Sequence, residues 1–140
     1  MTKPACVFCD IVAKKIPGHV VYEDETAVAF LDVKPLFVGH VLVVPREHVV
    51  TLPELPLESV GPFFERVQAI ARAVPEALGS QGTFVAMNNV VSQSVAHLHC
   101  HVVPRTKGDG LKGFFWPRTK YQSDAQMRET AEKIRSHVSL

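Results

Sequence analysis

The clearest pattern in the chain is a helical stripe between Leu57 and Leu78, where apolar residues recur every three or four positions. This spacing places them on one face of a helix and predicts a long amphipathic helix over these residues. Gly79 is expected to end it, because glycine is favoured just after a helix. Pro75 is expected to kink or shorten the helix, since proline has no amide hydrogen to donate.

Two shorter helices are also predicted. A helix over 8–15 is expected to close before Pro17, which biases the preceding residue away from helical angles. A second amphipathic stripe predicts a helix over 123–137, where Ser123 and Gln126 have the spacing of a capping box.

Short segments rich in Val, Phe, Leu and Tyr predict strands between these helices. The first two flank an acidic turn and are expected to form a hairpin. An order of hairpin, long helix and further strands predicts an α+β domain with an antiparallel sheet, one long helix and one or two shorter ones, in a single domain over 1–140. The predicted strands are 19–22, 26–31, 40–44, 83–87 and 98–103.

Composition and charge narrow the functional classes. The chain has 140 residues, of which 46% are hydrophobic and 21% charged, as in globular proteins. Its formal net charge of +1 gives no electrostatic footprint for duplex nucleic acid or an anionic membrane. Without a long apolar run or an apolar N-terminal signal, the protein is expected to be cytoplasmic.

Three of the seven histidines alternate at His97, His99 and His101. In a strand their imidazoles would share one face, and imidazole can act as nucleophile, acid, base or metal ligand near neutral pH. The pattern alone also fits a polar sheet face or a histidine metal clamp. The polar loop 88–95 before it carries side-chain donors suited to holding an anion.

These residues and several N-terminal segments together resemble the histidine triad family, over about residues 5–105. The segments that carry the resemblance are Cys6-Val7-Phe8-Cys9-Asp10-Ile11, Ile16-Pro17, Tyr22-Glu23-Asp24, Ala29-Phe30-Leu31-Asp32, Gly39-His40-Val41-Leu42-Val43-Val44-Pro45 and Gln93-Ser94-Val95-Ala96-His97-Leu98-His99-Cys100-His101-Val102-Val103.

The resemblance implies the histidine triad fold and an enzyme that hydrolyses or transfers nucleoside monophosphates at the α-phosphate. His99 matches the nucleophile, which would form a nucleotidyl-histidine intermediate. His101 matches the residue that contacts the α-phosphate and orients the nucleophile. Gln93 and Ser94 match residues that contact the phosphate and the leaving group. A purine nucleotide is the implied substrate, either an AMP phosphoramidate or a dinucleoside polyphosphate.

The nucleotide pocket is also implied by the resemblance. Asp32 matches a residue that binds the ribose hydroxyls, and Asn88 or its neighbour Asn89 is expected near the phosphate. His40 matches a supporting group beside the triad. Ser92 replaces a glycine that relatives often carry, which leaves the loop's contacts open. The apolar slot around the base is expected from Phe8, Ile11, Phe30, Val33 and Leu42.

Cys6 and Cys9 form a C-x-x-C pair, which is a frequent half of a zinc site. A redox pair or two buried cysteines are alternative interpretations. Relatives that carry zinc imply His48 and His97 as the remaining ligands. A site with four protein ligands would be structural rather than catalytic.

Two rival functions share the same residues. One is a nucleotide-binding sensor or interaction module with negligible turnover, and the other is a structural zinc domain. The resemblance further implies a homodimer with a sheet continued across the interface. The aromatic and basic segment 113–118 is expected to contact the leaving group or a second subunit, or to pack as a C-terminal anchor.

Overall fold

The computed structural model describes residues 5–111 and 118–140. Contacts divide the chain into two compact units, 1–109 and 110–140. The expectation of a single domain over 1–140 stays a prediction. Residues 113–117 of the aromatic segment lie outside the described residues.

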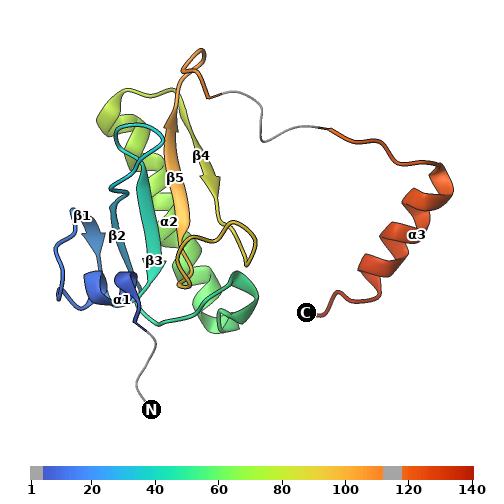
Figure 1. The fold of residues 1–140 in the computed structure, drawn as a ribbon, viewed down its shortest axis with the longest axis horizontal. Coiled ribbons are helices and arrows are strands. Elements are labelled where there is room, and N and C mark those ends of the chain that lie inside the picture. Colours follow the sequence, from blue (N-terminus) through green and yellow to red (C-terminus); the bar gives the residue numbers. More distant parts are fainter. Residues whose placement is uncertain (1–4, 112–117) are drawn as a thin grey trace. The chain divides into compact units, whose positions relative to one another are not determined.

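Unit 1–109 is built on a five-stranded antiparallel sheet with strand order β1-β2-β3-β5-β4 (Figure 1). This architecture confirms the predicted α+β class. The elements in chain order are α1 (Val7–Val12), β1 (Val20–Glu23), β2 (Ala27–Leu31), β3 (Val41–Pro45), the 3-10 helix η1 (Leu52–Glu54), α2 (Leu57–Leu78), β4 (Gly82–Ala86) and β5 (Cys100–Arg105).

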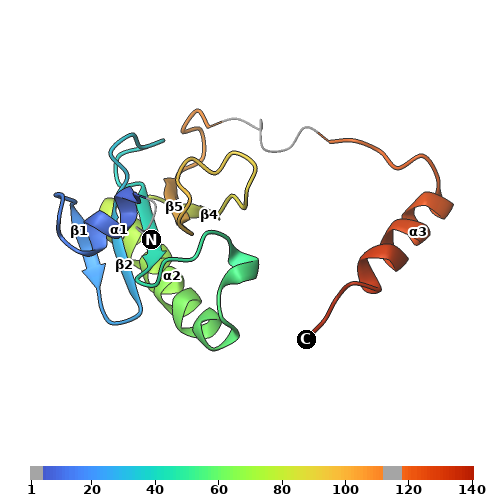
Figure 2. The same cartoon turned by 60° about the horizontal axis from the view of Figure 1, so that its bottom comes forward.

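Alternation along the strands gives the sheet two apolar faces, each covered by a helix (Figures 1 and 2). Helix α2 packs on one face, and the short α1 packs on the other. Because Leu42 is paired with His101 in the ladder between β3 and β5, His101 lies on the α1 face. The α2-face cluster includes Ala29, Val43, Phe63, Val67, Leu98, Cys100 and Val102, and the α1-face cluster is Phe8, Val28, Phe30, Leu42 and Val44.

Helix α2 has the predicted bounds and ends at Gly79, which adopts φ 73° and donates its N–H to the carbonyl of Pro75 at 2.8 Å. The helix continues to Leu78, so the expectation that Pro75 shortens it is wrong, and the kink expected as the alternative stays a prediction. Leu78 packs against Gly39, where an added Cβ would lie 2.1 Å from the leucine Cδ1. Gly39 therefore provides both a positive φ and a close approach at the start of β3.

Two predicted elements are displaced at their ends. Helix α1 stops at Val12 rather than at residue 15, and Lys14 adopts φ 59° outside it. Strand β5 begins at Cys100 rather than at Leu98. The register that pairs Val43 with Cys100 would place Leu98 opposite Pro45, which has no N–H to extend the ladder.

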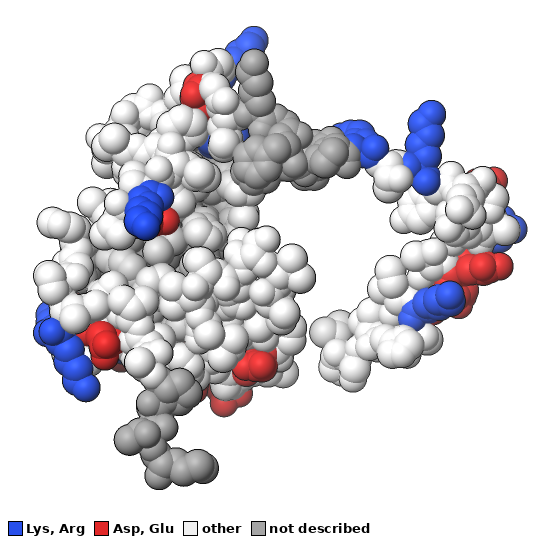
Figure 3. All heavy atoms as spheres, in the orientation of Figure 1, with Lys and Arg blue, Asp and Glu red and all other residues white. Residues whose placement is uncertain are grey.

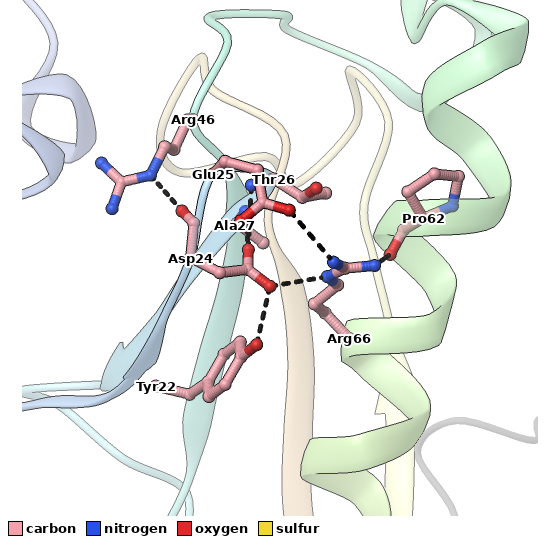
Figure 4. Close-up of polar contacts among 8 residues, drawn as sticks. All are labelled: Tyr22, Asp24, Glu25, Thr26, Ala27, Arg46, Pro62 and Arg66. Carbon is pink, nitrogen blue, oxygen red and sulfur yellow. Dashed lines mark hydrogen bonds and ion pairs between the residues drawn. The ribbon is translucent and has the colours of Figure 1, made fainter.

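A polar network connects the turn of the first hairpin to α2 (Figure 4). The Oδ1 atom of Asp24 accepts hydrogen bonds from the amides of Thr26 and Ala27, at 2.8 and 3.0 Å. Its Oδ2 atom accepts from the hydroxyl of Tyr22 at 2.7 Å and from Nε of Arg66 at 2.9 Å. These bonds attach the hairpin of β1 and β2 to helix α2.

Unit 110–140 contains helix α3 (Asp124–Arg135), close to the predicted 123–137. Ser123 caps its N-terminus, because the serine Oγ accepts a hydrogen bond from the amide of Gln126 at 3.1 Å. The side chain of Gln126 accepts from the amide of Gln122 at 2.7 Å, one residue before the capping position.

Within the described residues, every helix is too short or too polar to cross a bilayer. Charged side chains are scattered on the face of unit 1–109 that Figure 3 shows, where neither sign forms a large patch.

Candidate active site

A cavity of about 470 Å³ lies between α1, strands β2 and β3, and the histidine segment 94–101. The structure brings most of the predicted catalytic and nucleotide-binding residues to its wall. The lining residues include Phe8, Ile11, Phe30, Asp32, Val33, Leu42, Ser94, His99 and His101.

The orientation of His99 is fixed by its own backbone neighbour. Its Nδ1 atom lies 2.8 Å from the carbonyl oxygen of His97. A carbonyl can only accept, so Nδ1 carries the proton and Nε2 carries the lone pair. Among the described residues, every side-chain nitrogen or oxygen that is fully shielded from solvent has a hydrogen-bond partner. Nε2 of His99 has no hydrogen bond to a described residue, so it is not fully shielded. This nitrogen is therefore accessible from the cavity that His99 lines.

The proton positions on His40 and His101 follow from the same reasoning. The amide of Leu36 donates to Nδ1 of His40 at 3.1 Å, so His40 is protonated at Nε2. That Nε2–H donates to Nδ1 of His101 at 2.9 Å. His101 must then carry its proton on Nε2, which makes this atom a donor at the cavity wall.

Burial keeps both of these imidazoles neutral. Desolvation, together with the nearby His99 and His40, lowers the pKa of His101 to about 4, although the Asp32 carboxylate partly opposes this shift. Desolvation also lowers the pKa of His40, although the Asp32 carboxylate partly opposes this shift. Neutral rings preserve the donor and acceptor order described above, because a protonated His101 could not accept from His40.

Asp32 lies at the polar end of the cavity, directly after β2. Its Oδ1 atom accepts from the amide of Lys34 at 2.9 Å, and its Oδ2 atom lies 3.7 Å from Nε2 of His40. At the apolar end, the Phe8 ring contacts Phe30 and His99 edge to face, with centroid distances of 5.3 and 5.1 Å. The cavity thus joins an apolar slot to a row of polar groups.

Gln93 and Asn88 do not line the cavity in this structure. The amide nitrogen of Gln93 donates to the carbonyl of Val50 at 2.6 Å, and its amide oxygen accepts from the amide of Val90 at 2.9 Å. The Asn88 side chain donates to the carbonyl of Ser92 at 3.2 Å. Both side chains therefore brace the loop that precedes the histidines.

The loop 88–93 also holds two non-glycine residues at positive φ, Val90 at 72° and Ser92 at 62°. This conformation is rare for a β-branched residue. The side chain of Asn89 accepts from the amide of Leu52 at 2.8 Å and helps to fix the loop. Ser92 thus adopts the backbone conformation that a glycine would take more readily.

Several cavity residues were not expected from the sequence. The sequence predicts Pro17 only as the end of the first helix and Ile16-Pro17 as part of the family resemblance, and it predicts no role for Lys34. The one sequence signal for Lys34 is its position two residues after Asp32. An aspartate carboxylate often accepts a hydrogen bond from the amide two residues later, as it does here. The unexpected lining residues are Val7, Ile16, Pro17, Gly18, Leu31, Lys34 and Val95.

Cys6, Cys9, His48 and His97 form a compact cluster of the four residues that relatives with zinc imply as ligands. The Nδ1 atom of His97 lies 3.4 Å from Sγ of Cys6, 3.5 Å from Sγ of Cys9 and 3.2 Å from Nδ1 of His48. The Cys9 sulfur lies 3.1 Å from Nδ1 of His48.

This donor set fits zinc. Bonds of about 2.3 Å to sulfur and about 2.0–2.1 Å to nitrogen place tetrahedral ligand atoms roughly 3.3–3.8 Å apart, close to the spacing in the cluster. Nε2 of His97 lies 2.9 Å from the carbonyl of Pro45 and must donate to it, which leaves the Nδ1 lone pair facing the cysteines. Burial lowers the pKa of His97 and so favours the neutral ring that a ligand needs.

Comparison with known proteins agrees with this arrangement. The model of the HIT domain family matches residues 13–108. The "Protein hit" of Bacillus subtilis is 38% identical over 137 residues, covering 96% of this chain and 92% of that protein. The adenosine 5'-monophosphoramidase hnt1 of Schizosaccharomyces pombe is 32% identical over 136 residues, covering 96% of this chain and 98% of that protein.

Solved structures give the same result. A HIT family protein from Bacillus subtilis superposes with a TM-score of 0.87 at 32% identity, covering 98% of this chain and 99% of the other. A zinc-bound histidine triad protein from Mycobacterium smegmatis superposes with a TM-score of 0.73 at 36% identity, covering 94% and 96%. The chain therefore belongs to the HIT domain family, the histidine triad family that its sequence resembles.

Proposed function

We propose that this protein hydrolyses or transfers nucleoside monophosphates at the α-phosphate of purine nucleotides, through a nucleotidyl intermediate on His99. The observation that carries the proposal is the hydrogen bond from Nδ1 of His99 to the carbonyl of His97, which leaves Nε2 accessible at the cavity wall. The hydrolase activity in the name of the related hnt1 protein supports the reaction class.

In the first step, the Nε2 lone pair of His99 attacks the α-phosphorus. The bond from phosphorus to the leaving group breaks, and the leaving group departs with the bonding electron pair and takes up a proton. The Nε2–H of His101 donates a hydrogen bond to a phosphate oxygen, where negative charge develops. The hydroxyl of Ser94, which also lines the cavity, contacts the phosphate or the leaving group.

In the second step, water attacks the phosphorus and loses a proton to solvent, while the bond to His99 breaks, which returns the electron pair to Nε2 and releases the nucleoside monophosphate. The Asp32 carboxylate binds the ribose diol, since it can accept two hydrogen bonds. The base occupies the apolar slot formed by Phe8, Ile11, Phe30, Val33 and Leu42. We assign Gln93 and Asn88 to the loop beside the phosphate, with Gln93 turning to reach it when a nucleotide binds.

We further propose that zinc is held by Cys6, Cys9, His48 and His97. A zinc ion with four protein ligands supplies a structural cross-link and has no open position for substrate. The donor spacing and the zinc-bound relative support this assignment. A thiolate site of this kind requires a reducing compartment, which supports a cytoplasmic location.

We propose a homodimer that pairs the edge strand β4 with its symmetry mate. In the sheet of the described residues, strand β4 is at one end, and an edge strand is where a second strand can pair. Val85 on this strand is 42% exposed, which gives the edge an apolar contact.

The test is hydrolysis of a panel of adenosine phosphoramidates and dinucleoside polyphosphates by wild type and His99→Ala, with mass spectrometry of the acid-quenched reaction. Wild type should turn over at least one of the two classes and carry AMP on His99, whereas His99→Ala should lose at least 10³-fold in kcat, an order set by loss of a covalent nucleophile. Tight AMP binding without turnover or adduct would instead establish the nucleotide sensor.

A further inference from the structure

Three segments meet at the cluster of Cys6, Cys9, His48 and His97: α1 and the histidine segment, which line the cavity, and the turn 45–50, which is hydrogen-bonded to the histidine segment. We propose that this cluster is a positioning site for His99 and Phe8, so that nucleotide affinity and reactivity depend on whether it holds a metal ion. The inference goes beyond a structural role for zinc, and it rests on the proposed function because AMP serves as the probe.

The first connection runs through His97, which is completely buried. Its Nε2–H is bound to the carbonyl of Pro45 at 2.9 Å, and its Nδ1 faces the two cysteines and His48. Its own carbonyl accepts from Nδ1 of His99 at 2.8 Å. A shift of His97 therefore moves the acceptor that fixes the proton and the ring plane of His99.

The second connection runs through α1, which has six residues and carries Phe8 between the two cysteines. A helix of this length is not stable alone, so tertiary contacts must hold it in place. Cys6 is its N-cap and accepts from the amide of Cys9 at 3.3 Å. Phe8 is 7% exposed and touches the His99 ring, so a displaced α1 would change both the base slot and the contact with the nucleophile.

The third connection is the turn 45–50, which carries His48. The amide of Leu98 donates to the carbonyl of Val49 at 2.7 Å, and the side chain of Gln93 donates to the carbonyl of Val50 at 2.6 Å. This turn therefore holds both ends of the segment that contains Ser94 and His97. An ion bound by His48 would connect the turn to α1 on the other wall of the cavity.

The four donor atoms of the cluster lie close enough to share one positive centre. Two ring nitrogens 3.2 Å apart and two sulfur atoms at similar distances present lone pairs toward one another. Without a metal ion, each thiol proton can bridge only one sulfur–nitrogen pair, whereas a divalent cation attracts all four atoms at once. Without the ion the cluster should open, and the two cavity walls should separate.

The primary experiment compares zinc-loaded wild type with the same protein after removal of zinc by a chelator. We expect the Kd for AMP to rise at least tenfold on zinc removal and to recover when zinc is restored. Hydrogen exchange at the amide of Leu98 should become faster in the zinc-free protein. Both measurements are made well below the unfolding temperature of the zinc-free form.

Variants of His48 separate positioning from general stability, because His48 does not line the nucleotide cavity. His48→Cys keeps a zinc ligand and should keep the AMP affinity within about threefold, whereas His48→Ala removes one ligand and should weaken both zinc and AMP binding. The control is Val74→Ala, a truncation on the buried face of α2. It lowers stability without touching the cluster or the cavity. It should leave the Kd for AMP within about twofold of wild type.

The outcomes distinguish this inference from the proposed function. If zinc content and AMP affinity vary independently across wild type, zinc-free protein and the two His48 variants, the positioning role is wrong while the enzyme assignment stands. If zinc-loaded wild type does not bind AMP at all, the proposed function is wrong. In that case faster exchange at Leu98 on zinc removal still supports the mechanical connection, and unchanged exchange overturns it.

Discussion

A hydrogen bond to the backbone determines which nitrogen of a histidine is available for chemistry, and three imidazoles at or beside the cavity are ordered in this way. His99 and His97 each donate to a carbonyl, and His40 accepts from an amide. Each assignment leaves the opposite nitrogen with a defined role. The backbone, rather than solvent, therefore determines which nitrogen of each ring carries the proton.

The connection from His40 to His101 predicts the effect of His40→Ala. Loss of the Nε2–H donor leaves Nδ1 of His101 without its partner, so the proton on the His101 ring is no longer held at the cavity side. We expect kcat to fall about tenfold or more, with a small change in KM, as for loss of a group that stabilises developing charge. Steady-state kinetics measure both constants.

The matched control for this variant is His137→Ala, an exposed histidine in unit 110–140. It should have wild-type kinetics. Equal kcat values for His40→Ala and wild type would show that His101 does not depend on His40.

The Asp32 carboxylate gives a second prediction at this scale. Asp32→Ala should weaken AMP binding about tenfold, because a diol loses an anionic acceptor worth about 1.5 kcal/mol. An acyclic analogue without the 2′ and 3′ hydroxyls should bind wild type and variant with similar affinity. A variant that still prefers AMP over the acyclic analogue by the wild-type ratio would contradict the assignment of Asp32 to the ribose.

Among whole elements, the hairpin of β1 and β2 depends on its attachment to α2 through Asp24 (Figure 4). Burial of this carboxyl opposes ionisation, but hydrogen bonds from Tyr22, the amides of Ala27 and Thr26, and Arg66 outweigh it. The pKa of Asp24 therefore lies far below its usual range. The side chain is only 14% exposed, so solvent replaces these bonds poorly.

Asp24→Asn should lower the free energy of unfolding by about 1–2 kcal/mol at neutral pH, because the bonds to a charged acceptor are weakened. A lowered folded-state pKa stabilises the protein above the unfolded-state pKa of about 3.9, and this stabilisation is lost as the pH falls through the folded-state pKa. Urea unfolding at pH 7 and at pH 3 should show a smaller difference between the two proteins at pH 3. A difference that grows at acid pH would reverse the sign of the argument.

In the molecule as a whole, the nucleotide cavity is assembled from segments distant in sequence. Helix α1, the end of β2, β3 and the histidine segment each contribute to its wall, and the sheet order brings them together. The same sheet leaves β1 and β4 as its two edges. The proposed dimer uses only the β4 edge, so the same substitution on β1 serves as a matched control.

Val85→Lys should convert the dimer to a monomer, since a lysine on an edge strand opposes strand pairing. Val20→Lys makes the same change on β1, where the valine is 38% exposed, and should leave the dimer intact. Light scattering coupled to size exclusion gives the masses. A monomeric wild type, or a dimer lost only in Val20→Lys, would place the interface elsewhere.

Local patterns in the sequence were sufficient for the elements and for the family. The three-to-four spacing gave α2 at its observed bounds, and alternation placed Leu98, Cys100 and Val102 opposite the imidazoles, as the core cluster confirms. The C-x-x-C pair and two distant histidines were expected to converge, and they do. These features depend on side-chain periodicity or on a family pattern, both of which are written in the order of residues.

Tertiary structure alone decided what each polar group binds. The start of β5 depends on Pro45 in another strand, and the proton of His101 depends on the ring of His40, which is 61 residues away in the sequence. The bonds that hold the Gln93 side chain, and the entry of Ile16, Pro17 and Lys34 into the cavity wall, follow from contacts between segments. No periodicity encodes such pairings, because a hydrogen bond depends on the position of both partners in space.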